Sequence, residues 1–300
     1  FVTPLIGFAV TDIPDLTTRC AIYKTTDGGE NWTKVYNSST EGLSDVFFVD
    51  EKNGFAVGGS RPTQVGAYFK SSVKRTTDGG SNWSNLISGN GNIVRSIRFL
   101  DASTGYAVTT NDFGYIDIMK TQNGGLQWSK LKWDYSEKYT GTGGLRTVVC
   151  MDANQIIAGG DDGMIVKSTD AGASWKLISK GQFASGQAGD ITSTFFADEA
   201  TAYACFPTSI HKSTNGGINW KVLTNSGFSA LSFASANTGY AVGTNGRISK
   251  TTDGGTSWTA QTSTVTKYLV SAEFISQDVG YVGGESGTLL KTINGGSTWS

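Results

Sequence analysis

The octapeptide T25-T-D-G-G-E-N-W32 decides the fold, because six further stretches of the chain repeat its pattern. Each copy has Ser or Thr first, Asp or Asn third, Gly fifth and Trp last, and Lys or Arg stands directly before it. The copies end at Trp32, Trp83, Trp128, Trp175, Trp220, Trp258 and Trp299, so successive tryptophans are 51, 45, 47, 45, 38 and 41 residues apart.

A second element recurs upstream of each octapeptide. It reads G54-F-A-V57 and G239-Y-A-V242 in two copies, and more divergent forms are Q155-I-I-A158 and A202-Y-A-C205. A Phe, or Val149 in one copy, stands six residues before it. Apolar residues come in short runs between Gly, Asp and Asn without helical spacing, which predicts strands. Seven irregular copies of this kind are typical of a β-propeller with four strands per blade.

Each octapeptide is predicted to form the turn between the third and fourth strands of its blade. Asp or Asn can accept backbone N–H bonds across a tight turn, and the glycines permit positive φ. The Trp is expected to fill the gap between neighbouring sheets. Because three copies carry uncharged Asn, the inferred role is hydrogen bonding and not ion chelation. The structural residues are Asp27 with Trp32, Asp78 with Trp83, Asn123 with Trp128, Asp170 with Trp175, Asn215 with Trp220, Asp253 with Trp258 and Asn294 with Trp299.

The octapeptide resembles the Asp-box, or bacterial neuraminidase repeat, S/T-x-D-x-G-x-x-W. Combined with elements such as G239-Y-A-V-G243, it is most similar to the photosystem II assembly and stability factor family. The resemblance implies an all-β, seven-bladed β-propeller with four-stranded antiparallel blades. Residues 1–300 are expected to form one propeller. Phe1 aligns with Phe48 and the chain stops just after Trp299, so the inner strand of blade 1 and the outer strand of blade 7 are expected to be truncated.

Composition argues against several partners. The formal charge of −1 leaves no basic excess for nucleic acid. No apolar run reaches the length of a membrane-spanning helix, so no membrane insertion is expected. Cys20, Cys150 and Cys205 cannot form a disulfide framework, and the last two are expected to be buried, unreactive thiols.

Catalytic constellations are missing from the sequence. The single histidine, His211, excludes histidine-based triads and multi-histidine metal sites, and it lies in a predicted strand. Carboxylates such as Asp134 and Glu137 could supply a glycosidase pair, but they match no motif of that chemistry. We therefore predict no catalytic residue, no metal and no cofactor. A glycoside hydrolase of the xyloglucanase or sialidase type is kept as an alternative.

Extra sequence gathers in the loops of blades 1–5 on the face opposite the predicted turns. Insertions on a rigid scaffold are where binding usually resides, and neutral loop drift is the alternative. Aromatic rings beside charges are typical of protein interfaces and of sugar-stacking sites. The candidate ligand- or partner-binding residues in these inserts are Arg61, Tyr68, Phe113, Tyr115, Trp133, Tyr135 and Tyr139.

The leading hypothesis is a non-catalytic binding or scaffold propeller of a secreted, periplasmic or cell-surface bacterial protein. Its ligand would be a protein or a glycan, and it would act as a monomeric ring or as part of a larger assembly or chain. The family resemblance implies a second hypothesis, a photosystem II assembly factor of the thylakoid lumen. That hypothesis requires a basic patch, for which Arg95, Arg98 and Arg146 on predicted inner strands are the candidates.

Overall fold

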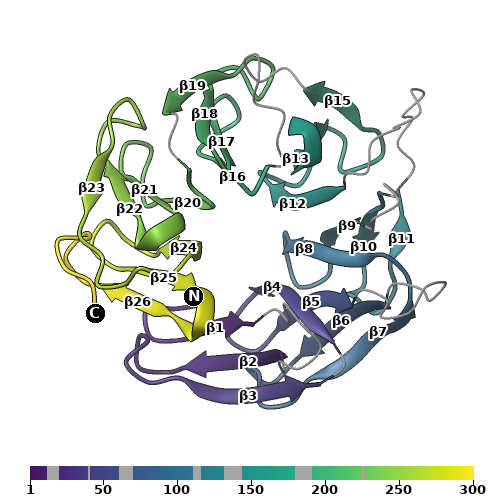
Figure 1. Ribbon diagram of the computed structural model, residues 1–300. Coiled ribbons are helices and arrows are strands. Elements are labelled where there is room, and N and C mark those ends of the chain that lie inside the picture. Colours follow the sequence, from purple (N-terminus) through teal and green to yellow (C-terminus); the bar gives the residue numbers. More distant parts are fainter. Residues whose placement is uncertain are drawn as a thin grey trace, which may run out of the picture. The chain divides into compact units, whose positions relative to one another are not determined.

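The computed structural model describes residues 1–11, 20–39, 41–60, 70–110, 116–131, 144–179, 191–224 and 227–300. Within these ranges the regular structure is β-sheet, with three single-turn 3₁₀ segments as the helices. The strands form seven antiparallel sheets, which are the blades of a seven-bladed β-propeller (Figure 1). In the described residues the sheets of blades 1 and 7 have three strands and the other five have four.

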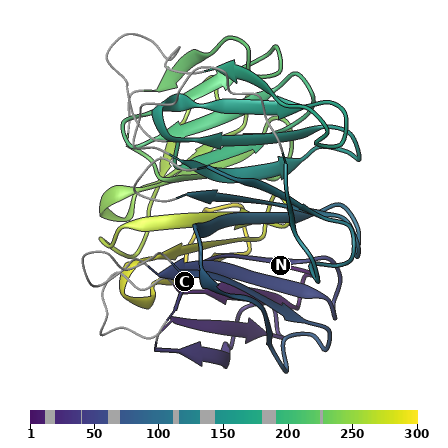
Figure 2. The ribbon, with the colours of Figure 1, turned by 90° about the vertical axis from the view of Figure 1, so that its right-hand side faces the viewer.

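Tertiary contacts divide the chain into two compact units, Phe1–Ala158 with Val166–Lys176 and Gly159–Ile165 with Leu177–Ser300. The first unit contains blades 1, 2 and 3. Blade 1 consists of β1 (Gly7–Val10), β2 (Cys20–Thr25) and β3 (Thr33–Ser38), and blade 2 of β4 (Gly42–Phe48), β5 (Gly54–Ser60), β6 (Lys70–Thr76) and β7 (Ser84–Asn90). Blade 3 consists of β8 (Ile93–Phe99), β9 (Gly105–Thr110), β10 (Ile118–Thr121) and β11 (Ser129–Lys130). Seen from the side, the strands of each blade run back and forth (Figure 2).

Blade 4 has residues in both units and contains β12 (Leu145–Cys150), β13 (Ile156–Gly160), η1 (Asp161–Gly163), β14 (Ile165–Ser168) and β15 (Lys176–Ser179). The second unit contains blades 5, 6 and 7. Blade 5 consists of β16 (Ser193–Phe196), β17 (Ala202–Phe206), β18 (Ser209–Ser213) and β19 (Lys221–Thr224), and blade 6 of β20 (Ala230–Phe233), β21 (Gly239–Val242), η2 (Thr244–Gly246), β22 (Ile248–Thr251) and β23 (Thr259–Gln261). Blade 7 consists of β24 (Leu269–Phe274), β25 (Gly280–Gly284), η3 (Glu285–Gly287) and β26 (Leu289–Thr292).

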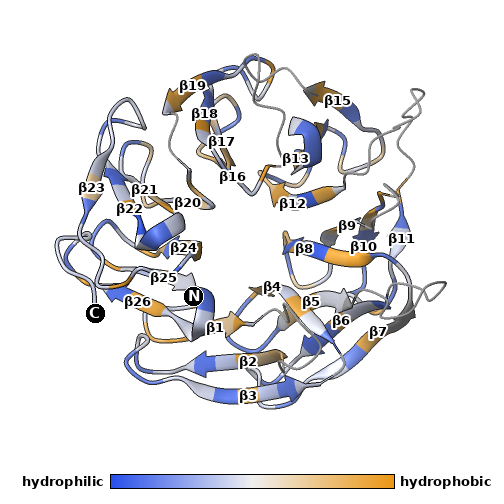
Figure 3. Cartoon of the chain, in the orientation of Figure 1, coloured by the Kyte–Doolittle hydropathy of each residue, from blue (hydrophilic) through white to orange (hydrophobic). Residues whose placement is uncertain are grey.

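Burial differs between the strands of a blade. The second strands β9, β13, β17 and β21 are buried at every position, because side chains on both of their faces pack against other residues. The outer strands β3 and β11 have no buried position, and hydrophilic colours accordingly appear on β3 in Figure 3. This explains why the G-F/Y-A-V element is apolar without alternation, as expected of a strand covered on both faces.

The octapeptide of blade 2 shows how the repeated turn is held. Thr76 ends β6, and its Oγ1 donates to Asp78 Oδ1 over 2.8 Å while accepting the Gly80 N–H over 2.9 Å. The Asn82 N–H donates to Asp78 Oδ1 over 2.9 Å, and Trp83 Nε1 donates to the Gly80 carbonyl over 3.1 Å. The side-chain bond from Asn82 is the main reason that the pKa of Asp78 falls to about 2.

The three turns that carry Asn use the same bonds. Asn123 Oδ1 accepts the Gln127 N–H over 2.9 Å, and Asn215 and Asn294 accept their equivalents over 2.9 and 3.0 Å. The glycine after each Asn also donates its N–H to a carbonyl of the preceding hairpin. These bonds are Gly124 to Ser103, Gly216 to Ala200 and Gly295 to Asp278, over 2.9, 2.8 and 2.9 Å. The turn therefore depends on an acceptor oxygen and not on a charge.

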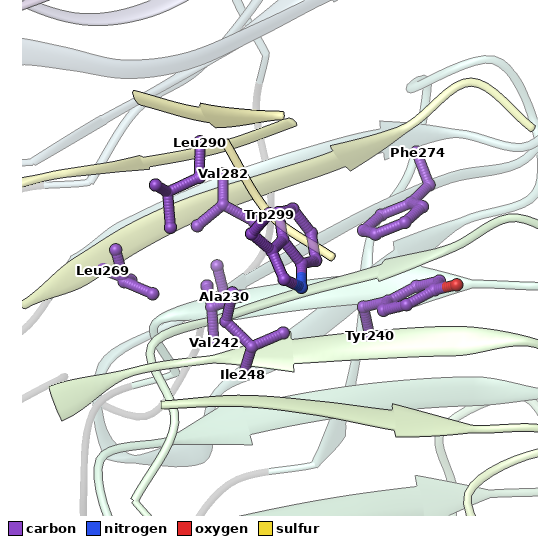
Figure 4. Packing of buried hydrophobic residues seen from close by; sticks show 9 residues of the cluster. All are labelled: Ala230, Tyr240, Val242, Ile248, Leu269, Phe274, Val282, Leu290 and Trp299. Atoms are coloured by element: carbon purple, nitrogen blue, oxygen red, sulfur yellow. The ribbon is translucent and has the colours of Figure 1, made fainter. Parts of the chain in front are cut away.

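Stacked aromatic rings join one blade to the next. Tyr240 of β21 lies flat on Phe274 of β24, with ring centroids 3.5 Å apart, and Phe274 meets Trp299 edge-on at 6.0 Å (Figure 4). Trp299 also packs in a cluster with Val242 and Ile248 of the preceding blade. The same succession recurs in Phe8, Phe48 and Trp83, in Phe55, Phe99 and Trp128, and in Tyr203, Phe233 and Trp258.

The inner-strand Phe also dictates a glycine in its own blade. A Cβ on Gly54 would lie 2.5 Å from the Phe48 ring, and a Cβ on Gly280 would lie 2.3 Å from the Phe274 ring. Neither glycine has positive φ, so the residue is required by the close approach of the ring and not by its backbone conformation. The Phe and the Gly therefore form one packing unit.

Blade 4 solves the same packing problem with different residues. Sequence spacing predicts Val149 and Gln155 at the Phe and Gly positions, and the structure corrects both by one residue. The Met151 N–H donates to the Gln155 carbonyl over 2.9 Å, as Val49 does to Asn53 in blade 2. Cys150 therefore takes the position of Phe48, and the fully buried Ile156 takes that of Gly54. A smaller residue at the first position is matched by a larger one at the second.

This exchange predicts a compensating pair of mutations. Ile156→Gly alone should leave a cavity and cost roughly 2–5 kcal/mol, as large-to-small core changes do. Cys150→Phe alone should overpack the blade and cost about 1–3 kcal/mol. The double variant restores the Phe and Gly of the other blades, so its loss of stability should be well below the sum of the single losses. Urea unfolding of the four proteins measures this, and additive losses would refute the exchange.

Candidate functional site

The inner strands of neighbouring blades are linked by polar side chains at one repeated position. Asp45 of β4 accepts the Ile97 N–H of β8 over 3.1 Å, and Ser96 of β8 accepts the Val148 N–H of β12 over 3.4 Å. In the second unit the Leu231 N–H of β20 donates to Ser193 of β16, again over 3.4 Å. Each of these side chains satisfies a backbone donor of the next inner strand.

One arginine of this region is already neutralised. Arg98 of β8 places Nη1 2.7 Å from Asp45 Oδ2, and its guanidinium lies over the Phe47 ring at 5.6 Å. The same carboxylate oxygen accepts the Ser96 hydroxyl over 3.0 Å. Asp45 is therefore a multiple acceptor that holds Arg98 across the boundary between blades 2 and 3.

Two further arginines lie at matching positions of adjacent inner strands. The pairing of β8 with β9 shifts register between Val94 and Ser96, so that Arg95 is the extra residue of a β-bulge. A bulge of this kind changes the direction of a side chain. Arg146 follows Leu145 in β12, at the position that corresponds to Arg95 once the strands are aligned on Cys150. Arg146 is exposed and Arg95 is half-buried. These two arginines, 51 residues apart in the sequence, thus lie on neighbouring inner strands.

The topology tells which end of the blade these arginines occupy. β8, β9 and β10 are antiparallel neighbours, and the octapeptide turn follows β10. β8 therefore ends at the side of that turn and begins at the opposite side, where Arg95 lies. This is the side on which the sequence predicts the elaborated loops.

The insert residues themselves lie outside the described part of the chain. This holds for all seven candidates, Arg61, Tyr68, Phe113, Tyr115, Trp133, Tyr135 and Tyr139. Two charged residues lie close in sequence to two of these inserts, Asp117 after the first and Lys130 before the second. Asp117 pairs with Lys130 over 2.9 Å and accepts from Asn92 Nδ2 over 3.1 Å.

A Ser–His pair exists, but it is enclosed in the core of blade 5. Ser209 Oγ and His211 Nε2 are 2.8 Å apart in β18, and neither residue is exposed to solvent. Burial lowers the pKa of His211 to about 4, so the imidazole is neutral at physiological pH. Since no substrate reaches this pair, its role is structural.

Other reactive groups in the described residues are equally inert. Burial raises the pKa of the Cys150 and Cys205 thiols to about 12, although Cys150 is only half-buried by solvent exposure. Asp161 and Asp162 belong to the single turn η1, in which Asp162 has a φ of 54°. Among the described residues, no group of three or more His, Cys, Asp or Glu residues is placed so that it could hold a metal ion.

A shallow hollow of about 250 Å³ lies beside the octapeptide turn of blade 3. Its lining residues are Lys120, Gln122, Asn123, Gln127, Ser129 and Leu131. Lys120 Nζ donates to the Ala171 carbonyl over 2.7 Å. Lys120, the cationic residue of this lining, therefore forms a hydrogen bond across the boundary between blades 3 and 4. The hollow has no paired acid and base. In the part of the chain that the structure describes, no helix is long and apolar enough to span a membrane.

These features define a class of protein: a propeller of Asp-box-like turns with arginines on its inner strands. Within this class, the chain belongs to the photosynthesis system II assembly factor YCF48 family, whose model matches residues 80–228 and 221–300. No curated protein matches the sequence.

Solved structures share the fold of this chain. "YCF48 bound to D1 peptide" has a TM-score of 0.68 at 16% identity, covering 99% of this chain and 84% of that one. YCF48 from Cyanidioschyzon merolae has a TM-score of 0.68 at 18% identity, covering 95% and 98%. A GH74 xyloglucanase from Xanthomonas campestris reaches only 0.41 at 14% identity, covering 94% and 53%, and says nothing about activity here. At these identities the likenesses show the fold alone.

The buried histidine predicts how stability depends on pH. The pKa of His211 is lowered from 6.5 to about 4. At pH values between these two, the imidazole is protonated in the unfolded chain and neutral in the folded chain. Stability should therefore fall as pH drops from 6.5 to 4. Part of this loss should disappear in His211→Gln.

Urea midpoints at several pH values between 7 and 4 measure the effect. Asp residues of the octapeptide turns also lose stabilisation in acid. The quantity to compare is therefore the slope of the urea midpoint against pH, in the wild-type protein and in His211→Gln. Ser209→Ala keeps the buried imidazole and should keep the steep slope. Equal slopes for wild type and His211→Gln would contradict the assignment.

Proposed function

We propose that this chain is a non-catalytic propeller that binds an extended, acidic segment of a partner protein. The contact lies at Arg95 and Arg146, on the side of the blades opposite the octapeptide turns. The observation that carries the proposal is the placement of these two arginines at the same level of adjacent inner strands, with Arg146 exposed.

The chemistry of the arginines suits a carboxylate-bearing peptide. A guanidinium binds a carboxylate through two parallel N–H bonds, and charge-assisted bonds are the strong ones. Arg98 is held by Asp45, with Nη1 2.7 Å from Oδ2, and is not part of the proposed contact. The structure described as YCF48 bound to D1 peptide supports a protein ligand over a glycan.

Photosystem assembly is the setting that family membership supports. In that setting the partner is a subunit of the complex and the compartment is the thylakoid lumen. A secreted or cell-surface propeller with another protein partner is the alternative. Co-purification with photosystem subunits from the source cells supports the first setting, and their absence from those cells supports the second.

Peptide binding tests the arginines directly. A labelled D1 peptide should bind the wild-type chain in a fluorescence anisotropy titration, and added salt should weaken binding. Each charge-assisted bond contributes about 1.5–3 kcal/mol, so Arg146→Glu should weaken affinity by at least roughly tenfold. Arg95→Glu should act in the same direction. Arg247→Glu is the matched control, since Arg247 is an exposed arginine of blade 6 outside the proposed contact.

Unchanged affinity in both Arg95→Glu and Arg146→Glu would reject the placement. Binding of a glycan panel in place of peptides would reject the class of ligand. Release of products from a polysaccharide panel would reject the non-catalytic assignment.

The insert aromatics provide a second, separate test. We expect Trp133 and Tyr139 to lie near the partner because the inserts belong to the same face. Replacing both by Ala should weaken peptide binding without changing the urea midpoint. Equal affinity would leave the arginines as the binding residues and remove these aromatics from the proposal.

A further inference from the structure

Blade 2 contains a lysine at a position that blades 3, 4 and 7 fill with apolar residues. Lys74 precedes the basic residue of its octapeptide, where Met119, Val166 and Leu290 stand in blades 3, 4 and 7. Its side chain is 0% exposed. A wholly buried ammonium needs partners for its three protons, because leaving it unpaired is costly.

Two side chains touch the ammonium at the same distance. Lys74 Nζ lies 2.6 Å from Glu41 Oε2 and 2.6 Å from Asn85 Oδ1. Glu41 stands just before β4, and Asn85 lies on β7, directly across from Lys74 of β6. The pairing of β6 with β7 shifts register between Val73 and Lys74, which sets the positions of these two side chains.

The surroundings keep most of this cluster away from water. The Tyr36 ring of β3 lies 4.8 Å from Nζ, and Ser72 Oγ donates to Glu41 Oε2 over 2.7 Å. The Glu41 side chain is 18% exposed. Asn85 is itself an exposed residue, but its carbonyl oxygen faces the buried Nζ.

The Lys74 nitrogen contacts both a carboxylate and an amide, and these three groups are the set needed for an amide exchange. The carboxylate can remove a proton from the ammonium, and a lysine amine freed of its proton is a nucleophile. The hydrogen bond from Nζ polarises the Asn85 carbonyl and keeps the lysine nitrogen next to the side-chain amide.

We propose that Lys74 and Asn85 become joined by an isopeptide bond that the chain forms itself, with Glu41 as the acid–base group. Glu41 takes a proton from the ammonium, and the Nζ lone pair attacks Cγ of Asn85. The new Nζ–Cγ bond replaces the Cγ–Nδ2 bond. Two of the three ammonium protons pass through Glu41 to Nδ2, which leaves as an ammonium ion. Glu41 ends as a carboxylate, and nothing is oxidised or reduced.

The bond would fasten the outer hairpin of blade 2. It would close a covalent loop through Lys74, the octapeptide turn and Asn85, so that β7 could not separate from β6. Because Glu41 and Tyr36 belong to the path from blade 1 into blade 2, the cross-link forms only when these two blades have packed together.

Intact mass under denaturing, reducing conditions tests the proposal on the full chain. The wild-type protein should be lighter than its sequence by one molecule of ammonia, and a digest should contain a branched peptide joining Lys74 to Asn85. Glu41→Gln and Asn85→Ser should both have the full mass of their sequences. Asn37→Ser, an exposed position of an outer strand, should keep the deficit.

Asn85→Ser leaves the ion pair of Lys74 and Glu41 intact, so it tests the bond even if Glu41→Gln fails to fold. A wild-type mass equal to that of the sequence after prolonged incubation overturns the proposal. Loss of water in place of ammonia, or a deficit that persists in Asn85→Ser, overturns the assignment to Asn85.

Discussion

The face-to-face contact of two aromatic rings is the interaction on which four of the blade boundaries depend. An aromatic residue of one second strand lies on the Phe of the next inner strand, and that Phe meets the Trp of its own blade edge-on. Each ring thereby connects two sheets that share no ladder of hydrogen bonds. Aromatic pairs in these geometries add about 0.5–1.5 kcal/mol beyond the area that they bury. The Gly opposite the Phe is a consequence of the same contact, since a Cβ there would overlap the ring.

The octapeptide turn and the aromatic contact support one another. The turn orients Trp83 through its Nε1 bond to Gly80, and Trp83 then packs against the preceding blade. The basic residue before the turn extends the connection. Lys24 Nζ donates to the Gly79 carbonyl of the next turn over 2.7 Å. Sequence repetition thus encodes a boundary between blades as well as a blade.

Much of the fold is visible in the sequence because these contacts repeat at fixed spacing. The Phe six residues before the Gly, the apolar second strand and the octapeptide all recur, and their positions follow from local patterns. The alignment is wrong at Val149 and Gln155 because the Phe and Gly that fix the register are both replaced in blade 4. The candidate site is less predictable. Asp45 and Ile97 are brought together by tertiary packing, and no local sequence pattern predicts the hydrogen bond between them.

The lysine cluster shows the same limit. Ser71-x-x-Lys74 looks like a nucleophile motif, but Ser71 Oγ bonds to the Asn92 carbonyl, away from Lys74. The partners of Lys74 come from the path between two blades and from an outer strand. What sequence offers is one signal, a charged residue at a repeat position where Met, Val and Leu stand in blades 3, 4 and 7. Such exceptions to a repeat are where individual function is best sought.

The bond made by the first glycine of each turn has a chemical consequence. Three turns contain Asn followed by Gly, a pair whose amide is readily lost when the glycine nitrogen attacks the asparagine side chain. In this fold the nitrogens of Gly124, Gly216 and Gly295 are bound to carbonyls of the preceding hairpin. Before such an attack, the glycine N–H would have to lose this hydrogen bond and the turn would have to open. The architecture that positions the tryptophans therefore also slows chemical ageing, and a direct conversion of Asn to Asp would yield a residue that the other turns already use.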